Sequence, residues 1–436
     1  MTPRLVVPES FRPERWIGVC QTEREVLDCC WLANCLVRKA INSKDLRNGG
    51  YAELNKRTLD SVMNWRTSTR LIDGMIAAGA IVRRNRYEVG KFSRGYRLGS
   101  VYRSDRSRWI EPSDKKFIRQ VLKFITESHR INQERFRASH VLLDKCKSRI
   151  DICPNCASQV LSKLSTKDNQ FDNQRIQVED ILRGHFSFSL APSGRVFNPI
   201  TSLKRELRGC LSCEGEPLLG LDIVNSQPAF LAQMIYSEIR DYENRNNIKN
   251  NVIVHRDRIL PSLETIHDPR TQVFDWSKSE DRQDGLAFAH VAQNGWVYDE
   301  LLGYINHVEL AGLSWMDRDP GKHRFLVDVL AWCSQGYQYA SLVYEAFRKL
   351  HPAVCRYIDS FNSSDPSALI RHLQSVEAKF VIETVCPAIF SKHPSIFLMT
   401  LHDSIYAKKS DILKLRQGFS DAMRTVGFNF GLKIAA

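Results

Sequence analysis

The spacing of apolar residues changes along the chain, from helical periods to alternation and then to short continuous runs. Residues 22–39, TEREVLDCCWLANCLVRK, place apolar side chains at helical spacing between acidic residues at the start and basic residues at the end, which predicts a helix. Further helices are expected at about 51–65 and 67–78. Residues 81–98 then alternate around a central Gly-Lys, which predicts a β-hairpin. Three helices followed by a basic hairpin are typical of a winged helix, which we assign to residues 1–105.

Basic residues are concentrated around this hairpin. Between Arg83 and Arg108 there are nine Lys or Arg against two acids, with four aromatic residues interspersed. Such a segment suits contacts with phosphates. The alternative is a solvated hairpin in a domain that binds protein. The residues expected to contact DNA are Arg66, Arg70, Arg83, Arg84, Arg86, Lys91 and Arg94.

The remaining pattern predicts a larger α+β body. A polar linker is expected at 104–114, and helices are expected at 115–127 and 133–150 within a helical segment at 106–185. Residues 236–276 begin charged and rich in Asn, which indicates an exposed insertion. Helical patterns return at 284–294, 297–308, 324–332, 339–350 and 369–385, and a helix and closing strand are expected in 420–434.

Two apolar runs each end at an aspartate. In Pro217–Ala232, PLLGLDIVNSQPAFLA, a predicted buried strand ends at Asp222 and a helix follows. In Ile396–Tyr406, IFLMTLHDSIY, a second run ends at Asp403. Either residue alone is most simply a strand-end or helix-capping group. Two strand-borne acids brought together would form a site for divalent cations.

The segments around these acids resemble the palm of family A DNA polymerases and of their single-subunit RNA polymerase relatives. The resemblance covers roughly residues 186–434 and depends on four motifs in the same order: Ser193-Gly194-Arg195, Asp222–Ala232, the helix containing Gln374, and His402-Asp403. It implies a fold of N-terminal winged helix plus a thumb, palm and fingers body with an antiparallel palm sheet. The thumb-like segment would span 106–185, the palm 186–436, and the fingers about 236–365.

The activity implied by the resemblance is two-metal nucleotidyl transfer. Asp222 and Asp403 would be catalytic and, with Ile223, would hold two Mg²⁺ ions, with Mn²⁺ as a possible substitute. Nucleoside triphosphate contacts are expected from Gln227, Lys322 and Arg324. The expected contacts with the primer and template are Arg195, Arg208, Gln374 and His402.

The chain departs from the family pattern at three places. Gln227 stands where the DNA polymerases carry a Glu that screens the sugar 2′ position, and Ser404 follows His402-Asp403 as in the RNA polymerase relatives. The four-residue Arg-to-Lys interval of the fingers helix occurs at Arg318–Lys322. That interval contains Pro-Gly, which does not suit a helix interior. We also expect no proofreading exonuclease domain, because no Asp-x-Glu pattern precedes the palm.

Three functions therefore compete. The leading one is a minimal DNA polymerase for replication of a plasmid, phage or other mobile element. The second is an RNA-synthesising primase or small RNA polymerase. The third is a catalytically inactive winged-helix replication initiator or transcription regulator, in which the polymerase-like body no longer acts.

The net charge and the cysteine content limit which partners and which cellular compartment are expected. The formal net charge of +13 and the pI near 9.2 favour a polyanionic partner, but do not separate nucleic acid from an anionic membrane surface. No apolar stretch reaches transmembrane length and no signal peptide is apparent, so we expect a cytoplasmic protein. The twelve cysteines are then expected to be reduced thiols. A zinc ion held by Cys153, Cys156, Cys210 and Cys213 is disfavoured because the two C-x-x-C pairs lie far apart.

Overall fold

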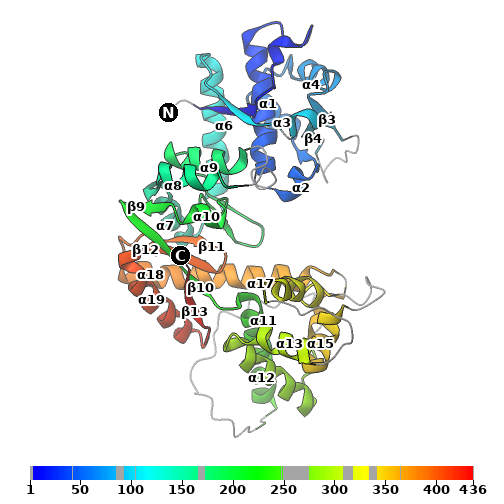
Figure 1. The fold of residues 1–436 in the computed structure, drawn as a ribbon, viewed down its shortest axis with the longest axis vertical. Helices are drawn as coiled ribbons and strands as arrows, with labels where there is room; N and C mark the ends of the chain where they lie inside the picture. Colours follow the sequence, from blue (N-terminus) through cyan, green and yellow to red (C-terminus); the bar gives the residue numbers. More distant parts are fainter. Residues whose placement is uncertain are drawn as a thin grey trace. The chain divides into compact units, whose positions relative to one another are not determined.

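A computed structural model of the chain describes residues 3–41, 43–84, 93–103, 105–164, 172–246, 248, 274–307, 318–332, 341–363 and 365–435. Helices and antiparallel strands combine in a mixed α+β fold (Figure 1). The chain forms two compact units. Unit 1 comprises Met1–Phe136, Ile152–Phe186 and Ser202–Cys210, and unit 2 comprises Arg137–Asp151, Ser187–Thr201 and Leu211–Ala436. Among the described helices, none has the length and apolar character needed to cross a membrane.

Unit 1 begins with two small antiparallel sheets and the helices around them. One sheet pairs β1 with β5, and the other has the order β2-β4-β3. The elements of unit 1 are β1 (Leu5–Pro8), η1 (Pro13–Arg15), α1 (Glu23–Ile41), α2 (Lys44–Arg47), β2 (Ala52–Glu53), α3 (Lys56–Asp60), α4 (Ser68–Ala77), β3 (Ile81–Arg83), β4 (Gly95–Leu98), α5 (Ser100–Arg103), β5 (Ser107–Ile110), α6 (Lys115–Gln133), α8 (Pro154–Leu161), α9 (Asn173–Leu182) and α10 (Arg205–Arg208). The boundary between the units falls within β6 (Ile150–Ile152).

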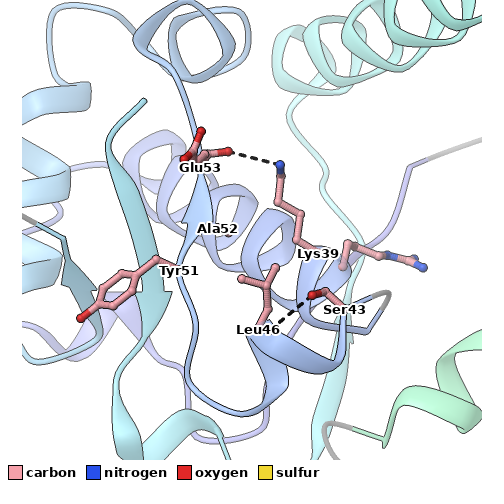
Figure 2. A pocket seen from close by; sticks show the side chains of 7 residues that line it. Lys39, Ser43, Leu46, Tyr51, Ala52 and Glu53 are labelled. Atoms are coloured by element: carbon pink, nitrogen blue, oxygen red, sulfur yellow. Dashed lines mark hydrogen bonds between the residues drawn. The ribbon is translucent and has the colours of Figure 1, made fainter. Parts of the chain in front are cut away.

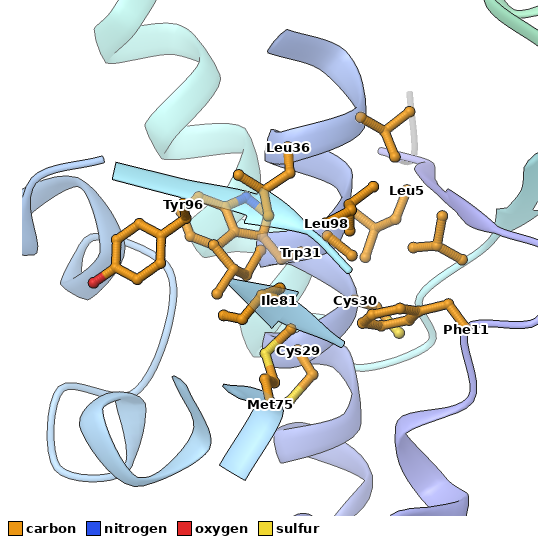
Figure 3. Close-up of a cluster of buried hydrophobic side chains, with 14 of the residues drawn as sticks. Leu5, Phe11, Cys29, Cys30, Trp31, Leu36, Met75, Ile81, Tyr96 and Leu98 are labelled. Carbon is orange, nitrogen blue, oxygen red and sulfur yellow. The ribbon is translucent and has the colours of Figure 1, made fainter. Parts of the chain in front are cut away.

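The core of unit 1 forms around α1, whose apolar face is almost fully buried (Figure 3). Trp31 from α1 is 2% exposed and shares this core with Met75 from α4 and with Ile81 and Leu98 from the hairpin. Ile81 lies directly opposite Leu98 in the β3–β4 register. The apolar stripe of the helix and the alternating pattern of the hairpin therefore meet in one core.

The structure confirms several elements predicted for this region and corrects two. Helices α1 and α4 and the antiparallel β3–β4 pair lie where the patterns placed them. The helix expected at 51–65 is wrong in extent, because Ala52–Glu53 pairs with β4 and Asn55 caps a shorter helix, α3. The linker expected at 104–114 is also wrong in part, since it contains β5, which pairs with β1 about 100 residues earlier.

The expectation that all cysteines are reduced thiols is wrong for one pair. Cys156, in the first turn of α8, forms a disulfide with Cys210, and the N–H of Cys153 donates to the carbonyl of Cys210 at 3.0 Å. One cysteine of each C-x-x-C pair is thus used in the same bond. Within the described part of the chain, no group of three or more His, Cys, Asp or Glu side chains is arranged to hold a metal ion.

Unit 2 is organised around the central strand β10. Its sheet runs β11-β12-β10-β9, and β13 also pairs with β10 (Figure 1). The elements of unit 2 are α7 (Ala138–Cys146), η2 (Lys147–Arg149), β7 (Ser189–Leu190), β8 (Val196–Phe197), β9 (Leu211–Cys213), β10 (Glu216–Ile223), α11 (Ser226–Arg245), α12 (Ser279–Gln293), α13 (Val297–His307), α14 (Arg318–Arg324), η5 (Phe325–Val329), α15 (Leu342–Leu350), α16 (Pro352–Phe361), α17 (Ala368–Lys379), η6 (Phe380–Val385), α18 (Cys386–Lys392), β11 (Met399–Leu401), β12 (Ser404–Lys408), η7 (Lys409–Asp411), α19 (Ile412–Thr425) and β13 (Leu432–Ala435).

Aromatic side chains pack α11 and η6 against the segment that leads to β13. Phe230 makes edge contacts with Phe380, Phe428 and Phe430. Such pairs add to the stabilisation that comes from burying the rings. Helix α11, which follows Asp222, is therefore anchored to the sheet near the end that carries this residue.

One expectation about the helices of unit 2 needs correction. Pro-Gly within Arg318–Lys322 does not suit a helix interior, yet α14 spans Arg318–Arg324. Pro320 falls in the first turn, where a backbone N–H has no partner within the helix and proline is tolerated. The insertion expected at 236–276 begins as a continuation of α11 to Arg245, and most of it lies outside the described residues.

Candidate active site

Asp222 lies near the end of the most central strand of unit 2. Leu218, Leu221 and Ile223 of β10 are buried, while Asp222 is only half-buried. The chain then turns sharply into α11 at Asn225, which has a φ of +52° and donates to the carbonyl of Gly295 at 2.6 Å. Asn is one of the few residues that tolerate this left-handed conformation. The strand–helix junction predicted after Asp222 is therefore present.

Asp403 lies in the tight turn between β11 and β12. His402, the other turn residue, has a φ of +56°. In the antiparallel register, Asp222 lies directly opposite Ser404. Asp403, the residue before Ser404, is therefore brought next to Asp222 although 181 positions separate them in the sequence. The structure thus places the two predicted acids side by side at the same end of two paired strands.

Close packing on the sheet beside Asp222 depends on a glycine. A Cβ at Gly220 would lie 3.0 Å from Ser404 Oγ and 3.1 Å from the Tyr406 ring. Gly220 lies opposite Tyr406, just as Asp222 lies opposite Ser404. The absence of a side chain lets Ser404 and Tyr406 pack closely against β10. Ser404 Oγ is buried and has no hydrogen-bond partner among the described residues.

A third carboxylate, Glu377 of α17, lies at the same site and was not among the predicted site residues. Its side chain is 1% exposed. Arg195 Nε donates to Glu377 Oε1 at 3.1 Å, and Arg195 Nη2 does so at 2.5 Å. The other oxygen, Oε2, accepts from Ser226 Oγ and from Gln227 Nε2, both at 2.8 Å. Glu377 of α17 therefore joins α11 and the segment just before β8 through a fully hydrogen-bonded, buried ion pair.

The surroundings of Asp403 shift the pKa of its carboxyl. Burial, followed by the charges of Glu377 and Asp222, raises the pKa of the Asp403 carboxyl to about 7, while the charge of Lys322 opposes this shift. Lys322 is exposed and belongs to α14. It is one of the residues predicted from the sequence to contact the triphosphate. The negative charges of the cluster therefore exceed the positive charge that neighbouring residues supply.

The donor set fits a hard divalent cation. Asp222 and Asp403 offer carboxylate oxygens at one edge, and Mg²⁺ commonly uses one or two protein carboxylates together with water and substrate phosphates. Burial and the charges of Glu377 and Asp222 outweigh that of Lys322 in raising the pKa of Asp403, so a cation bound beside this carboxylate would stabilise its ionised form. Glu377 differs, because Arg195, Ser226 and Gln227 already occupy its oxygens.

Other predicted site residues lie in different settings. Ile223 is buried and pairs with Leu432, and Gln374 is half-buried on α17. Arg324 forms an ion pair with Asp328 at 3.5 Å. Arg208 belongs to unit 1, where its Nε donates to the carbonyl of Leu203.

The predicted DNA contacts of unit 1 divide into paired and unpaired side chains. Arg70 bonds to Glu25 and to the Val19 carbonyl, and Arg83 forms an ion pair with Asp73 at 3.0 Å. Arg66 and Arg84 are exposed and have no carboxylate partner among the described residues, and the Arg66 guanidinium lies over the exposed Trp65 ring. Arg94 is also exposed. Arg86 and Lys91 lie outside the described residues.

A shallow hollow of about 500 Å³ occurs elsewhere in unit 1 (Figure 2). Lys39 Nζ in this hollow donates to the backbone carbonyl of Glu53 at 3.2 Å, so its charge is partly satisfied. No cluster of reactive groups accompanies it among the residues that line it: Arg38, Lys39, Ser43, Leu46, Tyr51, Ala52 and Glu53. The hollow offers no chemistry comparable with the carboxylate cluster of unit 2.

Comparison with known proteins gives no independent assignment, because no protein-family model matches the chain and no curated protein matches it either.

Proposed function

We propose that the chain is a template-directed nucleotidyltransferase that extends the 3′-hydroxyl of a nucleic acid. The observation that carries this proposal is that Asp222 of β10 and Asp403 of the β11–β12 turn lie side by side. The resemblance to family A polymerases implies two acids brought together on an antiparallel palm sheet. The proposal is supported by the antiparallel pairing of β10, which carries Asp222, with β12, which follows Asp403. The helix with Gln374 supplies Glu377 to the same place.

In this proposal, Asp222 and Asp403 are the residues that would hold Mg²⁺. When bound, Mg²⁺ activates the attacking hydroxyl and neutralises the triphosphate and its leaving group. Lys322 attracts the triphosphate electrostatically, since its charge already acts on Asp403. Glu377 and Arg195 keep α11 and α17 in a fixed relation around the reacting groups.

We propose that the N-terminal part of unit 1 is a winged helix that binds duplex DNA. Its support is the order α1, α2, β2, α3, α4, β3, β4 with the sheet order β2-β4-β3, in which α4 takes the place of a recognition helix. Arg66 and Arg84 are available for phosphate contacts, whereas Arg70 and Arg83 support the domain through Glu25 and Asp73.

The sequence favours a DNA polymerase of a plasmid, phage or other mobile element, with the winged helix holding an origin or duplex. An RNA-synthesising enzyme is the second candidate. It is favoured by Gln227, whose amide is bonded to Glu377 in place of a carboxylate at that position. Both candidates share the same chemistry at Asp222 and Asp403 and differ in the sugar of the nucleotide.

A primer-extension assay with dNTPs or rNTPs and with Mg²⁺ or Mn²⁺ tests the proposal. We expect Asp222→Ala and Asp403→Ala to abolish incorporation while duplex binding stays intact. Asp421→Asn is the matched control, because Asp421 lies on the surface of α19 in an ion pair with Lys392. Duplex binding without incorporation of any nucleotide under either metal would instead support an inactive initiator or regulator.

A further inference from the structure

Two free thiols of unit 1 lie in contact with each other. Cys29 of α1 is fully buried in the core, and Cys20 is half-buried in the segment that precedes this helix (Figure 3). Their Sγ atoms are 3.7 Å apart, within hydrogen-bond distance for sulfur. A disulfide needs about 2.05 Å between the sulfurs, so they would have to approach by about 1.7 Å. A small movement of the segment that carries Cys20 is enough to close this gap.

The surroundings give the two thiols different reactivity. The hydrogen bond from Cys29 lowers the pKa of Cys20, and the charge of Arg70 adds to this effect. Burial and the charges of Glu25 and Glu14 oppose it. The hydrogen bond to Cys20 and burial raise the pKa of Cys29 instead. Because the thiolate is the form that reacts with peroxides, Cys20 is the thiol of this pair that is both accessible and activated.

We infer that Cys20 and Cys29 form a peroxide-reactive pair, in which Cys20 is oxidised first and Cys29 then closes a disulfide. The Cys20 thiolate attacks one oxygen of H₂O₂ and the O–O bond breaks. Hydroxide leaves and takes up a proton, which gives a sulfenic acid at Cys20 and one water. The Cys29 thiol then attacks the Cys20 sulfur, and the sulfenic oxygen leaves with the Cys29 proton as a second water. The two thiols together lose two electrons, which the peroxide gains.

The pair lies beside contacts that support α4. On one side of Cys20, the carbonyl of Val19 accepts a hydrogen bond from Arg70 Nη1 at 2.6 Å. On the other side, the N–H of Gln21 donates to Glu25 Oε2 at 2.6 Å, and Glu25 is itself paired with Arg70. A disulfide from Cys20 to α1 would therefore act on the segment that holds Arg70 of α4. This modification site is independent of the nucleotidyl transfer proposed for unit 2.

Peptide mapping after oxidation tests the inference. The full chain is treated with a few equivalents of H₂O₂, remaining thiols are blocked with N-ethylmaleimide, and tryptic peptides are analysed by mass spectrometry without reduction. Trypsin cleaves after Arg24, so a Cys20–Cys29 bond links peptide 16–24 to peptide 25–38. We expect this link in most of the oxidised protein, and dithiothreitol should remove it.

Three variants identify the two partners and their order of reaction. Cys29→Ala should abolish the link and leave a sulfenic acid at Cys20, which dimedone labels. Cys20→Ala should abolish the link and leave no sulfenic acid at the buried Cys29. Cys30→Ala is the matched control, because it removes a buried thiol from the same core and keeps the Cys20–Cys29 pair. Since Cys30 and Cys35 share a tryptic peptide with Cys29, this control also shows which cysteine is linked.

The outcomes that overturn the inference are distinct. A wild type without the link, or with sulfinic acid at Cys20 in its place, shows that Cys29 does not react with the oxidised thiol. A link that survives Cys29→Ala, or that is lost in Cys30→Ala, shows that the pairing is wrong. If Cys29→Ala does not fold, as judged by its melting temperature, Cys20→Ala decides, because it changes a half-buried residue outside the helix and must still remove the link.

Discussion

Replacing Asp403 by Asn should stabilise the folded chain at alkaline pH. Burial, Glu377 and Asp222 raise the pKa of Asp403 from the usual 3.8 to about 7. The folded state therefore holds this proton more tightly than the unfolded state does, and stability falls as the pH rises between about 4 and 7. Asn cannot ionise, so the variant escapes this loss.

The magnitude follows from the size of the shift. At about 1.4 kcal/mol for each pKa unit, a shift from 3.8 to about 7 gives an upper limit of about 4 kcal/mol at pH 8. Asp403 keeps partial contact with solvent, which screens its charge, so we expect a gain of about 2 kcal/mol. At pH 5 the folded wild type is mostly protonated, and the gap between the two proteins should be less than half of that at pH 8.

Urea unfolding of both proteins at pH 5 and pH 8 measures this gap. Asp421→Asn provides a control of opposite sign, because the neighbouring Lys392 lowers the pKa of Asp421 and its carboxylate stabilises the fold at neutral pH. Millimolar Mg²⁺ should stabilise the wild type at pH 8 and have little effect on Asp403→Asn, since a ligand stabilises the state that binds it. An Asp403→Asn protein no more stable than wild type at pH 8 would refute the crowding of carboxylates inferred here.

Five other substitutions test different parts of the chain. Cys156→Ser should lower the free energy of unfolding by about 4 kcal/mol under non-reducing conditions, because the disulfide closes a loop between residues 54 apart; reductant should bring wild type to the same value, and stoichiometric zinc in the purified chain would contradict the disulfide. Arg66→Ala and Arg84→Ala should each reduce by about one the slope of log affinity for duplex DNA against log salt in fluorescence anisotropy. Arg70→Ala should instead lower thermal stability, since it breaks the bond to buried Glu25. Gly220→Ala should destabilise the fold by about 1–3 kcal/mol in urea unfolding, because the new Cβ would crowd Ser404 and Tyr406.

The elements predicted best from sequence are those whose signal is local. Helix α1 combines an apolar stripe with charges that suit its ends, and β10 is a short apolar run that ends at an acid. Strands β1 and β5 were missed because each has only four residues and its partner lies about 100 residues away. The Cys156–Cys210 bond could not be deduced, since spacing alone does not decide which cysteines pair.

Within the candidate site, sequence identified Asp222 and Asp403 but not Glu377. A glutamate on an amphipathic helix is ordinarily expected on the solvated face. The signal that reverses this expectation is Arg195, which is 182 positions away in sequence. It becomes visible only when the segment just before β8 packs against α17. A buried charge needs such a partner, so its tertiary contacts and not its local pattern determine where it lies.

If the proposed site binds cations, the charges of the cluster would make its response to cations depend on its protonation. Asp222, Asp403 and Glu377 carry three negative charges when ionised, whereas Arg195 and Lys322 supply two positive charges. One negative charge remains unbalanced. Near neutral pH a proton on Asp403 neutralises this charge, but the protonated carboxyl no longer serves as a carboxylate ligand. A divalent cation competes for the same position. Cation affinity should therefore rise with pH until Asp403 is fully ionised, and cation binding near pH 7 should release a proton that Asp403→Asn cannot release.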